Sequence, residues 1–153
     1  MMRGMKRVLS GVVCVLAFAA ATTVASAATA KPSCSHCGYV WAKGTGTVIE
    51  DSASGASVAS IKTGSIAVRG GNTTVSGASS HHWDSNLKAT VYKGNTMCLK
   101  ASGDFWVKIT GTVSNFSSTA RASVTLNGSG DYTVNNGPKK KWSSSSHPLS
   151  IRW

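Results

Sequence analysis

Acidic side chains are the scarcest charged groups in this 153-residue chain, which has five Asp and Glu against sixteen Lys and Arg. The formal net charge is +11 at neutral pH. Most glycoside hydrolases work with a pair of carboxylates, and the spacing of the five acids singles out no such pair. This scarcity argues against a glycosidase and predicts attraction to polyanions. The acids are Glu50, Asp51, Asp84, Asp104 and Asp131.

Helical periodicity is absent from the chain after residue 27. Residues 61–134 instead alternate apolar and polar side chains and are punctuated by glycine, most clearly in 64–70, 104–111 and 122–128. Alternation with a period of two predicts strands with one buried face, and glycine suits the turns between them. We expect one all-β domain, an antiparallel sandwich or barrel of about eight to ten short strands. A β-solenoid is the alternative, disfavoured because the glycine spacing is irregular.

A long apolar run occurs only near the N-terminus, at residues 8–24. Basic residues precede it, and Ala25-Ser26-Ala27 follows as a small-residue cleavage box. We therefore expect residues 1–27 to be a signal peptide and the protein to be extracellular, without a membrane span in its mature part. An uncleaved anchor is the alternative. Loss of the three basic residues in this segment lowers the formal net charge to +8.

Composition divides the rest of the chain into three parts. Residues 28–38 form a cysteine-containing leader, residues 39–137 the β domain, and residues 138–153 a basic, serine-rich tail. The tail has three consecutive lysines beside Trp142. A solvated tail of this charge is attracted to polyanions.

Three cysteines follow the predicted cleavage site, namely Cys34, Cys37 and Cys98. An exported protein usually pairs its cysteines, so we expect Cys37–Cys98 or Cys34–Cys98 to tie the leader to the sheet. A tight Cys34–Cys37 loop is less favoured. A thioredoxin-type redox pair lacks the helix that such chemistry requires. A lone C-x-x-C is weak evidence for zinc, even with His81 and His82 as further ligands, and we expect no metal or other cofactor.

Alternation separates two faces of the predicted strands. One face is apolar and is the expected core: Leu87, Ala89, Val91, Met97, Leu99, Phe105, Val107, Ile109, Val124 and Leu126. The opposite face mixes cations with aromatic rings, which stack on sugars or bases while Lys and Arg attract anionic groups. An ordinary solvent-facing side is the alternative. The candidate binding residues are Arg69, Lys88, Tyr92, Lys100, Trp106 and Lys108.

The predicted loop at residues 77–86 has the only cluster of catalytic residue types, His81-His82-Trp83-Asp84-Ser85. Catalytic triads are assembled by the fold and rarely come from adjacent residues. We therefore predict no catalytic residues. We interpret the loop as a polar excursion in which Trp83 either plugs an end of the core or contacts a ligand.

The segment Arg121-Ala-Ser-Val-Thr-Leu-Asn-Gly-Ser-Gly-Asp-Tyr-Thr-Val-Asn-Asn-Gly137, followed by Trp142, resembles the closing stretch of small secreted bacterial proteins built from glycine-punctuated β repeats. The resemblance covers about the last third of the chain. It implies the same all-β fold class and adds no site.

These features predict a non-catalytic binding or structural protein of the cell envelope. The expected partner is carbohydrate or another anionic surface polymer, and no specific nucleic acid. The alternative is a cationic secreted effector of antimicrobial or toxin type. A secreted hydrolase or thiol-redox enzyme is the third possibility.

Overall fold

The computed structural model describes residues 34–144 and 147–153 and confirms the all-β class. The predicted signal peptide and the first part of the predicted leader lie outside the described residues. The strands are β1 (Gly38–Ser76), β2 (Ser80–Asp84), β3 (Ala89–Val134), β4 (Lys140–Ser143) and β5 (Leu149–Arg152). All strand pairs are antiparallel. In the part of the chain that is described, no helix is long and apolar enough to cross a membrane.

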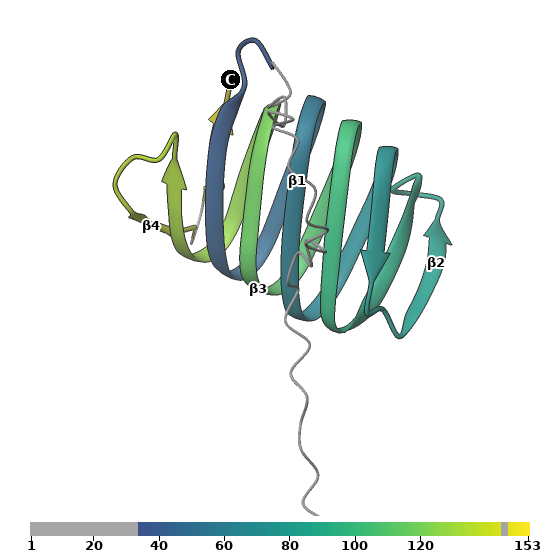
Figure 1. Cartoon of the computed structure of the whole chain (residues 1–153). Helices are drawn as coiled ribbons and strands as arrows, with labels where there is room; N and C mark the ends of the chain where they lie inside the picture. Colours follow the sequence, from purple (N-terminus) through teal and green to yellow (C-terminus); the bar gives the residue numbers. More distant parts are fainter. Residues whose placement is uncertain (1–33, 145–146) are drawn as a thin grey trace, which may run out of the picture.

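The two long strands β1 and β3 wind together into a coil, which Figure 1 shows from the side. A residue in the middle of β1 pairs with two residues of β3 on successive turns, as Val48 does with Ile109 and Leu126. The expected short strands are therefore the straight segments of this coil. Each segment continues into the next around a bend, whereas we expected separate strands joined by loops.

The straight segments form the two layers of a sandwich. The first layer consists, in spatial order, of β5, residues 123–126, 47–52, 105–110, 65–69, 89–93 and β2. The second layer consists of β4, residues 129–134, 38–43, 113–120, 56–61, 97–102 and 72–76. One apolar cluster lies between them, with Val48, Phe105 and Ile109 from the first layer and Ile61, Leu99 and Phe116 from the second.

Glycines line one bend of the coil. Gly46 pairs with Gly111 and Gly128, and Gly64 pairs with Gly111 and Gly94, so the row crosses adjacent turns. A Cβ atom on Gly46 would lie 2.1 Å from the carbonyl oxygen of Asn127, and its φ of +144° disfavours other residues. The glycines that interrupt the alternating segments of the sequence therefore mark where the chain bends between the layers.

The predicted core is confirmed for Met97, Leu99, Phe105, Val107, Ile109, Val124 and Leu126, each of which is at most 1% exposed. Ala89 and Val91 are also buried, but they do not share the main core. They form a second, small cluster with Ala67 on the outer face of the first layer, and Leu87 and Trp106 pack against it. The prediction of one common core face is therefore wrong for Leu87, Ala89 and Val91. Alternation does not continue through residues 93–96, where Thr96 has a φ of +61°, so the inward parity changes between Val91 and Met97.

The basic tail is part of the sandwich. β4 and β5 both pair with β3, and the Trp142 side chain joins the core with only 4% of it exposed. Trp142 faces Gly130, where a Cβ atom would lie 2.6 Å from the indole nitrogen. The boundary expected at residue 138 is therefore absent from the fold, because this end of the core needs the tail to cover it.

The predicted loop at residues 77–86 contains the strand β2, at the opposite end of the coil from β4 (Figure 1). Trp83 is 64% exposed and does not plug the core. Asp84 accepts hydrogen bonds from the backbone N–H groups of Asn86 and Leu87. This carboxylate therefore shapes the turn that leads into β3.

One carboxyl group is buried between the layers. Glu50 is completely buried and accepts hydrogen bonds from Ser57 (2.6 Å) and Ser118 (2.5 Å), which belong to the second layer. Burial raises the pKa of Glu50 because water no longer solvates its ionised form, and the two serines only partly oppose this. Glu50 thus links the layers by hydrogen bonds, and no cation of the described residues forms an ion pair with it.

Candidate binding surfaces

The six predicted binding residues do not share one face. Trp106, Arg69 and Lys108 lie together on the outer face of the first layer, and Lys88 lies in the turn before β3. Lys100 lies on the outer face of the second layer, beside Val58 and Thr74. The single platform expected from alternation is therefore incorrect.

Tyr92 points inward, so it does not lie on the outer face that was predicted for it. It pairs with the buried Ile66 and packs against the main core. Its ring also stacks on His81 of β2, with 5.7 Å between ring centroids and 28° between planes. Tyr92 thus covers the core near its β2 end, and the change of parity at residues 93–96 explains why alternation misplaced it.

Trp106 is enclosed by its own neighbours. The Arg69 guanidinium lies 4.5 Å from the ring centroid and donates a hydrogen bond to the carbonyl oxygen of Leu87. Apolar contacts to the cluster of Ala67, Ala89 and Val91 support the ring as well. This ring is half-buried and already stacked on a cation, so it is poorly placed as an open platform.

The cysteine arrangement differs from the prediction. Cys34 and Cys37 form a disulfide within one turn, with 5.3 Å between their Cα atoms. His36 has a φ of +68°, and the N–H of Cys37 donates to the carbonyl oxygen of Cys34. The leader cysteines are therefore joined to each other, because this tight turn brings them together without Cys98. Cys98 lies between the buried Met97 and Leu99 and is half-buried on the outer face, as alternation predicted.

The residues considered for metal binding are not gathered into one site. No group of three or more His, Cys, Asp or Glu side chains suited to a metal ion occurs within residues 34–144 and 147–153. His81 and His82 point to opposite sides of β2, because adjacent strand residues alternate. His82 lines a hollow of about 210 Å³ with Lys93 and Lys108 on the first layer.

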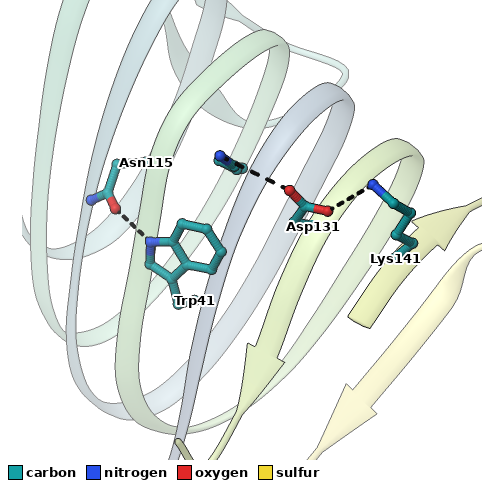
Figure 2. A network of polar contacts seen from close by, with 5 residues as sticks. Trp41, Asn115, Asp131 and Lys141 are labelled. Atoms are coloured by element: carbon teal, nitrogen blue, oxygen red, sulfur yellow. Dashed lines mark hydrogen bonds and ion pairs between the residues drawn. The ribbon is translucent and has the colours of Figure 1, made fainter. Parts of the chain in front are cut away.

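Sequence reasoning missed an oriented tryptophan on the second layer. Trp41 lies between the buried Val40 and Ala42, so its side chain is on the outer face. Its indole N–H donates a 2.8 Å hydrogen bond to the side-chain oxygen of Asn115 on the neighbouring strand (Figure 2). The alternation of residues 39–43 is the signal that would have placed Trp41 outside.

A network of one carboxylate and two lysines begins near this indole, at Lys43. Asp131 forms ion pairs with Lys141 at 3.2 Å and Lys43 at 3.9 Å (Figure 2), and the Lys43 ammonium is 6.0 Å from the Trp41 ring centroid. The hydrogen bond from Lys141 is the main reason that the pKa of Asp131 is lowered, and the charges of Lys139 and Lys43 contribute. Asp131 thus joins lysines from β1 and β4, and the β1 lysine is the one near the Trp41 ring.

We call this region the Trp41 surface and define it by Trp41, Lys43, Asn115, Asp131 and Lys141. The exposed Lys139 adjoins it, since its charge helps to lower the pKa of Asp131. A row of paired positions runs from it across adjacent strands, through Ser117 and Val58 to Lys100. Val58 is one of two large apolar side chains that are classed as exposed among the described residues. Lysines outnumber acids on this surface, since Asp131 is the only carboxylate in it.

Comparisons with protein-family models, with curated proteins and with solved structures find no match for this chain.

Proposed function

We propose that this protein binds an anionic polysaccharide or similar anionic polymer of the cell envelope, without catalysis, on the Trp41 surface. The observation that carries the proposal is the Trp41 indole, which Asn115 holds by its edge beside the Lys43–Asp131–Lys141 network. A ring held at its edge can present a face to a sugar, and the surrounding ammonium groups attract phosphate, sulfate or carboxylate.

Charge supports an anionic ligand. Asp131 cannot neutralise Lys43, Lys139 and Lys141 together, so the surface keeps a net positive charge. Exposed charges of this kind act over about one Debye length, roughly 8 Å at physiological salt. The lysines therefore supply attraction, and the oriented ring supplies short-range contact that salt does not screen.

The shape of the surface supports an extended ligand. The row from Trp41 through Ser117 and Val58 to Lys100 crosses neighbouring strands, which in any sheet are about 4.8 Å apart. The row is therefore on the order of 15 Å long, enough for a few sugar units. The expected export of the chain, from the pattern of residues 1–27, would bring this surface to the cell envelope.

The proposal is tested by measuring the affinity for dextran sulfate, with uncharged dextran as the matched polymer. We expect Trp41→Ala to weaken dextran sulfate binding about tenfold, equivalent to about 1.4 kcal/mol, and Trp106→Ala to leave it nearly unchanged. Lys43→Gln with Lys141→Gln should reduce the slope of log affinity against log salt, because fewer counterions are released.

Two results would overturn the proposal. One is equal affinity of Trp41→Ala and the unaltered protein over the whole salt range, which would leave only unspecific charge attraction. The other is equal binding of dextran and dextran sulfate, which would remove the anionic ligand. Thermal unfolding of each variant verifies that it remains folded.

A further inference from the structure

We propose a second binding site, for a compact zwitterion such as a free amino acid or a short peptide, at the end of the first layer near β5. The site is an open hollow of about 580 Å³. Its charged lining residues are Arg121, Arg152, Asp51 and Asp104, and the partly buried Trp153 also lines it. This inference does not depend on the Trp41 surface, which lies on the other layer.

Strand pairing separates the charges of this hollow by sign. Arg152 pairs with Ser123, and Ser123 pairs with Asp51 on the next strand. Arg121 precedes Ser123 by two residues on the same strand, and Asp104 lies on the strand beyond Asp51. The two arginines therefore occupy one side of the hollow and the two aspartates the other, with Ser123 between Arg152 and Asp51.

These four charged groups do not neutralise one another. Among the residues that the structure describes, the ion pairs within 4.0 Å are those that Asp131 makes with Lys43 and Lys141. All four side chains at the hollow are exposed. A ligand with a carboxylate and an ammonium group would meet both walls at once, with the carboxylate toward the arginines and the ammonium toward the aspartates.

The Trp153 side chain at this hollow is held in place. The Trp153 indole N–H donates to the carbonyl oxygen of Ala120, and the ring lies over Gly38, where a Cβ atom would collide with it. The backbone N–H of Trp153 donates to the carbonyl oxygen of Ala122. A fixed ring beside separated charges favours a zwitterion with a small apolar side chain.

Isothermal titration calorimetry with four probes tests this site. The probes are alanine, alanylalanine, N-acetyl-alanylalanine, which lacks the ammonium, and alanylalanine amide, which lacks the carboxylate. We expect at least one of the two zwitterions, alanine and alanylalanine, to bind. If alanylalanine is the better ligand, each blocked dipeptide should bind about tenfold more weakly than alanylalanine does. A preference for alanine over alanylalanine identifies the free amino acid as the ligand.

Variants locate the binding. Arg152→Gln and Asp51→Asn should each weaken the preferred zwitterion about tenfold, whereas Lys108→Gln, which removes a charge elsewhere on the same layer, should not. Trp41→Ala should leave zwitterion binding intact, so failure of this inference and failure of the polymer proposal are distinguishable. Equal binding of N-acetyl-alanylalanine and alanylalanine would overturn the inference in favour of a plain anion site, and no binding of any probe at millimolar concentration would overturn it entirely.

Discussion

Trp41 and Trp106 lie on opposite outer faces of the sandwich, and each has a cation near its ring. Arg69 is 4.5 Å from the Trp106 centroid and is fixed by a hydrogen bond to the backbone, while alanine and valine side chains pack against the same tryptophan. Lys43 is 6.0 Å from the Trp41 centroid and pairs with Asp131, and the indole of Trp41 is fixed by Asn115. One ring is held by contacts to its body and the other by a bond at its edge.

This difference separates a structural tryptophan from a binding one. Contacts to the body of a ring remove apolar area from water and stabilise the fold, but they use the surface that a ligand would need. A hydrogen bond to the indole N–H orients the ring at little cost in area.

Trp106→Ala should lower the free energy of unfolding by about 2–3 kcal/mol, somewhat less than for a fully buried tryptophan, because the ring is half-buried. Trp41→Ala should lower it by about 1 kcal/mol or less, since Trp41 lies outside the core. Urea unfolding of the two variants side by side measures both. A larger loss for Trp41→Ala than for Trp106→Ala would reverse our assignment of the two rings.

Glu50 connects the two layers that carry these rings, and its titration should appear in the stability. The pKa of Glu50 is raised above its ordinary value of 4.5, so the folded state keeps a proton in a pH range where the unfolded state has lost it. The free energy of unfolding should therefore fall as the pH rises from about 4.5 to the folded-state pKa, and then level off.

Glu50→Gln should remove this decline, because the amide keeps the size of the side chain and does not ionise. Urea unfolding between pH 4 and pH 8 measures the two profiles. Asp131→Asn, a change at the exposed carboxylate, is the matched control and should preserve the decline. An unchanged slope in Glu50→Gln would show that Glu50 is not its source.

Asn115→Ala should weaken dextran sulfate binding by about 1 kcal/mol, roughly fivefold, through loss of the hydrogen bond that orients Trp41. Thr119→Ala, on the same strand and face but outside the row from Trp41 to Lys100, is the control and should have a smaller effect. Fluorescence anisotropy should also show a more mobile indole in the Asn115 variant. Full affinity with a mobile ring would mean that orientation of Trp41 is unimportant.

Asp131→Asn should give the smallest effect, an increase in dextran sulfate affinity of about twofold at low salt that disappears at high salt. Removing the carboxylate leaves Lys43 and Lys141 without their counter-charge. A loss of affinity would mean instead that Asp131 is needed to position Lys43 and Lys141.

Alternation in the sequence predicted local features well where a segment stays straight. Residues 97–109 are the clearest case, because Met97, Leu99, Phe105, Val107 and Ile109 are all buried as expected. It failed across residues 93–96, where a positive φ and the glycine at 94 shift the inward parity and turn Tyr92 toward the core. Local patterns carry no information on such a shift.

The coil itself depends on contacts between distant residues. Val48 pairs with both Ile109 and Leu126, and Trp142 covers one end of the core. Both features result from the packing of successive turns against one another. The basic composition of residues 138–153 suggested a solvated tail, because composition does not show that an apolar residue among lysines completes a core. Trp41 was predictable from its buried neighbours, but its bond to Asn115 was not.

The assignment of the ligand face is tested most directly by the indole N–H signals in a proton–nitrogen correlation spectrum during titration with dextran sulfate. Tryptophan-to-phenylalanine variants assign the signals. We predict that the Trp41 signal shifts progressively with added polymer while the Trp106 signal stays in place. A shift of the Trp106 signal with an unmoved Trp41 signal would contradict the proposal and place the ligand on the first layer.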